Sequence, residues 1–171
     1  GLSPQLDFPK NAIKSVALTT QRATVINLDA EGKPLRPAII WLDQRLEKNL
    51  PGMGMWNVLL AVAGVKDTVR FFRSQAEAHW IKNNQPEIWE KTAKYLLLSG
   101  YLTYQLTGKY VDSVASQVGY LPFDFKRHDW AGPLDWKWRA LPIKRDQLPD
   151  LVPAGSPLGV ISAHAAKLTG I

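Results

Sequence analysis

The chain has no cysteine among its 171 residues, so it can form no disulfide and offers no thiolate to a metal. This absence fits the reducing cytoplasm, where disulfides are rare. Long apolar runs are also missing, because Gly64 and Lys66 interrupt the longest one well short of the ~20 residues that a membrane helix needs. Residues 1–10 carry two prolines and an aspartate in place of a secretory pattern. These absences predict a cytoplasmic protein with no membrane partner.

Several catalytic patterns are missing as well. No Gly-Lys-Ser or Gly-Lys-Thr sequence provides a P-loop, and the segment Gly52–Gly54 does not continue as a dinucleotide fingerprint. The histidines at 79, 128 and 164 lack the spacing of a metal site or of a nucleophile triad. The sequence of residues 1–171 therefore predicts neither a P-loop nor a dinucleotide-binding site. It also predicts no metal site and no catalytic residue.

Positive charge is concentrated in one window. Residues 126–145 hold six cations against two aspartates, which gives +4 of the formal +6. Trp130, Trp136 and Trp138 lie among these cations, a combination typical of nucleic-acid-binding surfaces. No nucleic-acid fold motif accompanies it, so packed aromatic residues among solvated cations are the simpler interpretation. A basic, Trp-rich nucleic-acid-binding module is kept as an alternative function.

Apolar periodicity and turn residues predict an α/β chain after an irregular lead-in at residues 1–11. Strands or extended segments are expected over residues 13–18, 25–28, 38–41, 96–98, 120–125 and 159–161. Helices are expected over residues 56–63, 100–107, 134–141 and 162–169, and from Ser74 and Pro86 onward. Ser74 and Glu77 have the spacing of a capping box, and Ser99 is the expected cap of the helix that Gly108 ends. Gly32 is expected to supply a positive φ in a turn.

Two polar clusters follow apolar runs within the first 45 residues. Gln21 and Arg22 offer amide and guanidinium donors, and a planar guanidinium can hold two vicinal hydroxyls or a phosphate oxygen. Asp43 adds an acceptor, so that both the donors and the acceptors of a diol could be matched. The alternative is structural, with Asp43 in an ion pair with Arg45 or Arg22 that holds the strands together.

Three segments, in order, resemble the N-terminal domain of the FGGY carbohydrate kinases, the family that includes glycerol kinase and xylulokinase. They are VALTTQRATVINLDAEGKPLRPAIIWLDQR (16–45), SGYLTYQLTGKYVDSVASQVGYLPFDFKRHDW (99–130) and LPDLVPAGSPLGVISAHAAKLTGI (148–171). In the second segment, the family's Leu-Thr-Gly helix end, aspartate, Ala-Ser pair and tryptophan correspond to Leu106-Thr107-Gly108, Asp112, Ala115-Ser116 and Trp130. Together the segments span most of the chain.

The resemblance implies a truncated ribonuclease-H-like (actin-like ATPase) α/β domain with a helical insertion. Family members close two such domains over a cleft and transfer the γ-phosphoryl of Mg-ATP to a sugar or polyol hydroxyl. Residues 1–171 would be an incomplete N-terminal sugar-binding domain that lacks the first strand, its phosphate turn and the C-terminal domain. The expected catalytic aspartate lies beyond Ile171. The fragment is therefore expected to be inactive alone and without cofactor, while ATP and Mg²⁺ belong to the parent protein.

The resemblance also implies where the sugar lies. Gln21 and Arg22 fall on the family's substrate-contacting loop, although Ala23 stands where some members have an acidic or aromatic-polar residue. The Trp-x-Asp-x-Arg element at residues 41–45 borders the sugar site, and Phe72 falls near a substrate-facing tyrosine of glycerol kinase. The expected substrate-binding residues are Gln21, Arg22, Asp43, Arg45 and Phe72. A kinase homologue that has lost catalysis is a further alternative function. The chain could also associate with copies of itself as a homo-oligomer.

Overall fold

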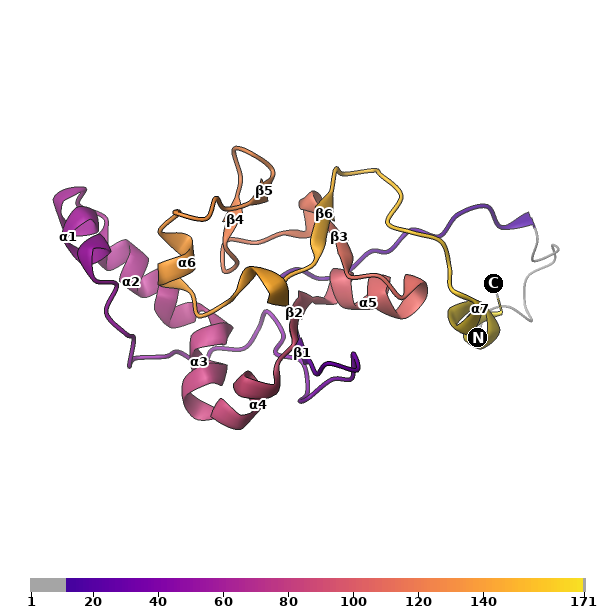
Figure 1. Cartoon of the computed structure of the whole chain (residues 1–171), viewed down its shortest axis with the longest axis horizontal. Helices are drawn as coiled ribbons and strands as arrows, with labels where there is room; N and C mark the ends of the chain where they lie inside the picture. Colours follow the sequence, from indigo (N-terminus) through magenta and orange to yellow (C-terminus); the bar gives the residue numbers. More distant parts are fainter. Residues whose placement is uncertain (1–11, 171) are drawn as a thin grey trace.

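A computed structural model describes residues 12–170 of the chain (Figure 1). The predicted irregular lead-in and Ile171 lie outside these residues. The helices are α1 (Met55–Val62), α2 (Lys66–Gln75), α3 (Glu77–Asn84), α4 (Pro86–Lys91), α5 (Leu98–Thr107), α6 (Lys137–Ala140) and α7 (Ala163–Thr169). The strands are β1 (Val25–Leu28), β2 (Lys94–Leu97), β3 (Val111–Ser113), β4 (Phe123–Asp124), β5 (Asp129–Trp130) and β6 (Asp150–Val152), and the short 3₁₀ turns are η3 (Val114–Ser116) and η4 (Arg145–Gln147).

The antiparallel pair β1 and β2 separates two apolar clusters. Its register places Val25 opposite Leu97 and Leu28 opposite Lys94. Side chains alternate between the faces of a strand. Accordingly Val25 and Leu97 enter the larger core, whereas Leu28 packs on the other face in a smaller cluster with Tyr104. All four residues of β1 are buried, because both faces of the pair are covered.

The remaining elements surround this pair. The four helices α1–α4 lie between β1 and β2 in sequence, which is the expected helical insertion. Parallel strands β3 and β6 pair beside α5, and β4 pairs antiparallel with β5. The molecule is elongated, with α1 and α2 at one end and α7 at the other (Figure 1).

Several local predictions are confirmed. Helices form at the expected places in α1, α5 and α7, and Pro86 opens α4. Gly108 and Gly170 end their helices in the left-handed conformation, with φ of 74° and 78°. Ser162 caps α7, because its side chain accepts a hydrogen bond from the backbone N–H of Ala165 at 3.1 Å. Gly32 has the expected positive φ of 79°.

Other predictions are wrong, and most of these concern extended segments. Residues 13–18 form no strand, because no described strand pairs with them, and most of their side chains are exposed. The predicted strand at 38–41 reduces to one bridge between Ile39 and Val25, since the chain turns at residues 41–42. Residues 159–161 form no strand, and the segments predicted at 120–125 and 134–141 shorten to β4 and α6. Helix α2 and strands β3 and β6 were not predicted.

Two predicted serine caps are also wrong. Ser74 lies inside α2 and donates its hydroxyl to the Phe71 carbonyl at 2.7 Å, so no capping box forms and α3 begins at Glu77 without a side-chain cap. Ser99 lies in the first turn of α5 and donates to Asp112 Oδ2 at 2.7 Å. Both serines therefore act as hydrogen-bond donors within or beside a helix, and neither accepts from a backbone N–H at a helix start.

Candidate functional site

The loop that precedes β1 holds two of the five predicted site residues. Gln21 Nε2 donates to Thr24 Oγ1 at 2.8 Å, and Arg22 Nη2 donates to the Ala115 carbonyl in η3 at 3.1 Å. Between them Ala23 has a φ of 55°, a left-handed conformation that costs an L-residue roughly 1–2 kcal/mol. Strained residues of this kind concentrate at binding sites. The loop is therefore a candidate site on structural grounds as well.

The second predicted cluster forms an ion pair. Arg45 Nε donates to Asp43 Oδ1 at 2.7 Å, and the Arg45 backbone N–H donates to the same oxygen at 3.0 Å. The Arg45 guanidinium also lies 4.2 Å from the centre of the Trp80 ring. The hydrogen bond from Arg45 lowers the pKa of Asp43, so this carboxylate stays ionised. Of the two ion pairs considered, Asp43–Arg45 forms, whereas the Arg22 side chain bonds to Ala115.

A polar layer that was not predicted lies next to Asp43. Burial raises the pKa of Glu77 to about 7, and the nearby Asp43 charge adds to this rise. Tyr95 is fully buried, and its pKa is raised well above its usual value by burial and then by Glu77. Arg36 donates from Nε to Gln85 Oε1 at 2.8 Å. Sequence patterns missed Glu77 because its spacing from Ser74 suggested a helix cap.

Stability should depend on pH through Glu77. Its folded-state pKa of about 7 lies above the usual 4.5, so the folded state holds a proton that the unfolded state loses between these values. The contribution of Glu77 to the free energy of unfolding should thus be largest below about pH 4.5, fall as the pH rises towards 7 and level off above 7. The loss is at most about 3 kcal/mol, because one pKa unit corresponds to ~1.36 kcal/mol.

Urea unfolding of Glu77→Gln at pH 5 and pH 8 checks this expectation. The variant should show a smaller decrease between the two pH values than the unchanged chain. Glu90→Gln, on the surface of α4, provides the matched control and should leave the decrease intact. An equal decrease in the Glu77→Gln variant would contradict the assigned role.

Phe72 lies apart from these contacts. Its ring stacks on Tyr120 with centres 5.4 Å apart and planes 9° from parallel, and Tyr120 donates its hydroxyl to Gln75 Oε1 at 3.0 Å. Phe72 is half-buried on α2, whereas the neighbouring Phe71 is 60% exposed. Among the five predicted residues, only Asp43 and Arg45 contact one another directly in the hydrogen bonds and ring contacts of the described chain. The role of all five residues in binding a substrate stays a prediction.

Two cavities of the described chain have none of the five predicted residues in their lining. The larger has a volume of about 990 Å³ and lies beside β3 and β6, where Lys94, Lys109 and Arg145 face Asp146 and Asp150. Two of its cations are already engaged, because Lys94 Nζ donates to the Asp146 carbonyl at 2.6 Å and Arg145 pairs with Asp150 at 2.9 Å. The smaller cavity, of about 170 Å³, lies between α1 and α2.

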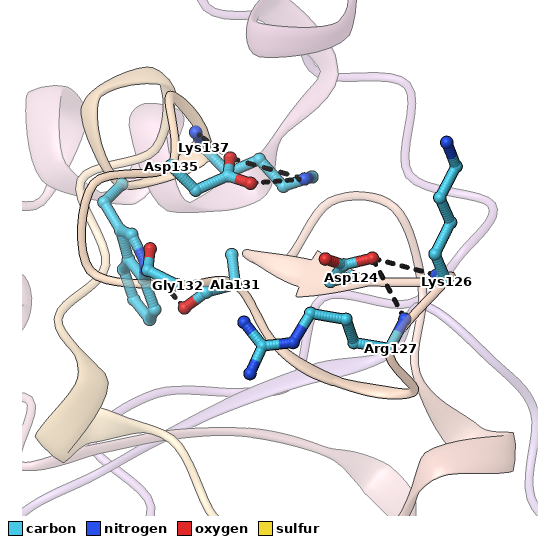
Figure 2. A network of polar contacts seen from close by, with 8 residues as sticks. Asp124, Lys126, Arg127, Ala131, Gly132, Asp135 and Lys137 are labelled. Carbon is cyan, nitrogen blue, oxygen red and sulfur yellow. Dashed lines mark hydrogen bonds and ion pairs between the residues drawn. The ribbon is translucent and has the colours of Figure 1, made fainter.

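The basic window at residues 126–145 does not present its tryptophans for base stacking. Trp130 is only 5% exposed and donates its indole N–H to the Pro149 carbonyl at 2.7 Å. Trp138 is half-buried and donates to the carbonyls of Ala131 and Gly132. Figure 2 shows the polar contacts of this region, in which Asp135 pairs with Lys137 at 3.2 Å. The nucleic-acid alternative is therefore not supported.

Within residues 12–170, no three His, Asp or Glu side chains gather closely enough to hold a metal ion. None of the helices in this part of the chain has the length and apolar character to cross a membrane.

Solved structures share this architecture. The gluconate kinase from Lactobacillus acidophilus superposes with a TM-score of 0.72 and 20% identity, over 99% of this chain and 34% of that one. The ligand-bound xylulose kinase from the same organism gives the same values. The fold is therefore that of the ribonuclease-H-like, actin-like ATPases, as predicted.

Sequence comparisons give the family. The sequence model of the FGGY family of carbohydrate kinases, N-terminal domain, matches residues 2–171. The xylulose kinase of Escherichia coli (strain K12) is 26% identical over 166 residues, which are 93% of this chain and 32% of that protein. The glycerol kinase of Thermococcus gammatolerans is 30% identical over 124 residues, which are 69% of this chain and 25% of that protein. The chain belongs to the FGGY family of carbohydrate kinases, and it spans about a third of the length of the xylulose kinase.

Proposed function

We propose that this chain supplies the sugar-binding part of an ATP-dependent carbohydrate kinase. The match of residues 2–171 to the family's N-terminal domain carries this proposal. Relatives are named for xylulose, glycerol and gluconate, which all carry vicinal hydroxyls, so the substrate class is a sugar or polyol. Gln21, Arg22, Asp43, Arg45 and Phe72 would contact it.

The polar groups suit a diol chemically. A guanidinium carries five N–H donors, so Arg22 can hold Ala115 and still donate to a substrate hydroxyl. Asp43 stays ionised beside Arg45 and would accept a hydrogen bond from a second hydroxyl. Arg22 is exposed, which leaves it open to solvent and to a ligand. A donor from one loop and an acceptor from the other would thus orient the sugar.

Mg-ATP would supply the phosphoryl group in the whole protein. The described residues do not form a site for Mg-ATP. They contain no cluster of metal-binding side chains, and the sequence contains no P-loop. We propose that residues 1–171 are an incomplete N-terminal domain of a longer cytoplasmic protein, whose catalytic aspartate, expected beyond Ile171, and ATP site lie in other segments.

Kinetics of the full-length protein test the sugar site. A panel of ketoses, aldonates and polyols identifies the best acceptor, with ATP turnover as the readout. Arg22→Ala should then lower kcat/KM for that acceptor about 10- to 100-fold, because a hydrogen bond from a charged group contributes roughly 1.5–3 kcal/mol. Arg22→Lys should recover only part of this loss, because an ammonium group does not reproduce the guanidinium fork.

Arg127→Ala is the matched control, because Arg127 is exposed and lies outside the proposed site. It should leave kcat/KM within about twofold, as expected for a surface residue away from the substrate. An unchanged kcat/KM in Arg22→Ala would remove Arg22 from the site. Absence of sugar-dependent ATP turnover across the panel would contradict the kinase assignment itself.

A further inference from the structure

The smaller cavity is lined by four cations and by no acidic residue. It lies between α1, α2 and the segment before α1, and its cations are Lys48, Lys66, Arg70 and Arg73. Its volume of about 170 Å³ is below the ~300 Å³ at which pockets for drug-sized ligands begin. A small anion fits this combination of size and charge.

Arg73 is the unusual member of this set, because it is a buried cation without an acidic partner. It is only 5% exposed, and it donates from Nη2 to the Pro51 carbonyl at 2.7 Å and from Nε to the Ala140 carbonyl at 2.9 Å. No carboxylate pairs with it among residues 12–170, and burial lowers its pKa. Two carbonyls satisfy its donors in part but do not cancel its charge. A buried charge is costly unless an opposite charge accompanies it.

The other three cations stand at the rim of the cavity. Lys48, Lys66 and Arg70 are exposed, and none of them forms an ion pair within the described residues. Residues 66, 70 and 73 are spaced so that α2 presents them along one face. Buried Met53 and Leu60 line the same cavity and lower the local dielectric, which strengthens attraction for an anion.

We propose that this cavity is a binding site for a phosphate-type oxyanion, either free phosphate or the phosphoryl group of a small molecule. The planar forks of Arg70 and Arg73 match the geometry of phosphate oxygens, and Lys48 and Lys66 add positive charge. The bound anion would neutralise Arg73 and hold α1, α2 and the Pro51 segment together. The site is separate from the proposed sugar site, because none of the sugar-site residues lines it.

Fluorine NMR of the full-length protein labelled with 5-fluorotryptophan tests this proposal locally. Trp56 lies in α1 next to the lining residue Asn57, and Trp56→Phe assigns its signal. Sodium phosphate and glycerol phosphate, each titrated at constant ionic strength with chloride as the balancing salt, should shift this signal saturably. The double variant K66Q/R70Q should weaken the apparent Kd at least tenfold.

The variant K126Q/R127Q removes the same charge from the other basic window and should keep the Kd within about twofold. Phosphate and glycerol phosphate also separate the two sources: binding of both indicates recognition of the phosphoryl group, and binding of phosphate alone indicates the free ion. No saturable shift with either probe would overturn the proposal, as would an equal loss in K126Q/R127Q. Thermal unfolding verifies that each variant is folded. If K66Q/R70Q does not fold, the single variant Arg70→Gln replaces it in the titration.

Discussion

Replacing Gly32 with alanine should lower the free energy of unfolding by about 3 kcal/mol. Gly32 has a φ of 79°, which costs an L-residue roughly 1–2 kcal/mol. An added Cβ would also lie 2.6 Å from Cζ and 2.7 Å from Cε1 of Tyr104. Tyr104 cannot easily retreat, because its ring stacks on Tyr110 with centres 4.3 Å apart. Forcing a methyl group into a packed site typically costs a further 1–3 kcal/mol.

Gly108→Ala separates the two contributions to this loss. Gly108 has a similar φ of 74°, but an added Cβ would meet nothing within 4 Å. It should therefore show only the backbone cost, roughly 1–2 kcal/mol. Urea unfolding of both variants measures the difference. Equal losses would mean that the Tyr104 ring moves aside freely and that the small cluster beneath β1 is not tightly packed.

Asp112→Ala should cost about 3 kcal/mol, because Asp112 is the acceptor for a buried network. It is 1% exposed and accepts hydrogen bonds from Ser99 Oγ at 2.7 Å, Gln117 Nε2 at 3.1 Å and the Ser113 N–H at 2.8 Å. Loss of the carboxylate removes the acceptor of the buried Ser99 and Gln117 donors, at roughly 1–3 kcal/mol each where no other partner exists, and of the half-buried Ser113 N–H. Gln117 also donates to the Ser113 carbonyl, so Ser99 should contribute most of the loss.

Asp112→Asn should cost less than Asp112→Ala, since an amide oxygen can still accept from Ser99. Burial raises the pKa of Asp112, because the buried site disfavours a negative charge. Replacing the carboxylate with a neutral amide therefore removes this cost of burying a charge. Asp150→Ala is the surface control, because Asp150 is exposed, and it should lose at most about 1 kcal/mol with its Arg145 ion pair. Chemical unfolding of the three variants gives the comparison, and similar losses for Asp112→Ala and Asp150→Ala would refute the buried network.

The Asp112 network also supports the proposed sugar site. Asp112 immediately precedes Ser113, whose side chain accepts from the Ala115 N–H at 3.2 Å at the start of η3. The Ala115 carbonyl in turn accepts from Arg22. Disturbing Asp112 should therefore loosen the position of Arg22 as well as the fold. If the proposed function holds, Asp112→Asn in the full-length protein should raise the KM for the sugar.

Features governed by neighbouring residues were predicted well. Gly32, Gly108 and Gly170 adopt left-handed conformations because glycine has no Cβ to oppose them. Pro86 opens α4, and Ser162 caps α7. The Asp43–Arg45 ion pair, two residues apart, was one of the alternatives considered. Each of these depends on chemistry within about four residues.

Predictions failed where a distant partner decides the outcome. Residues 13–18 have strand composition, but a strand requires hydrogen bonds to another strand, and the described chain provides none for them. β3 and β6 are only three residues long, and they form because the chain brings them side by side. Ser99 does not cap α5, because the helix begins one residue earlier at Leu98, and its hydroxyl donates to Asp112, 13 residues later in sequence.

The sequence by itself determined the family and the helical insertion, because these follow from motif order and local spacing. Only the tertiary structure decided which polar side chains are buried and which hydrogen-bond partners they have. Arg22 meets a carbonyl 93 residues away, and the buried Arg73 bonds to Ala140, 67 residues away. Long-range contacts and loss of solvent set these environments, and neither is encoded in the spacing of neighbouring residues.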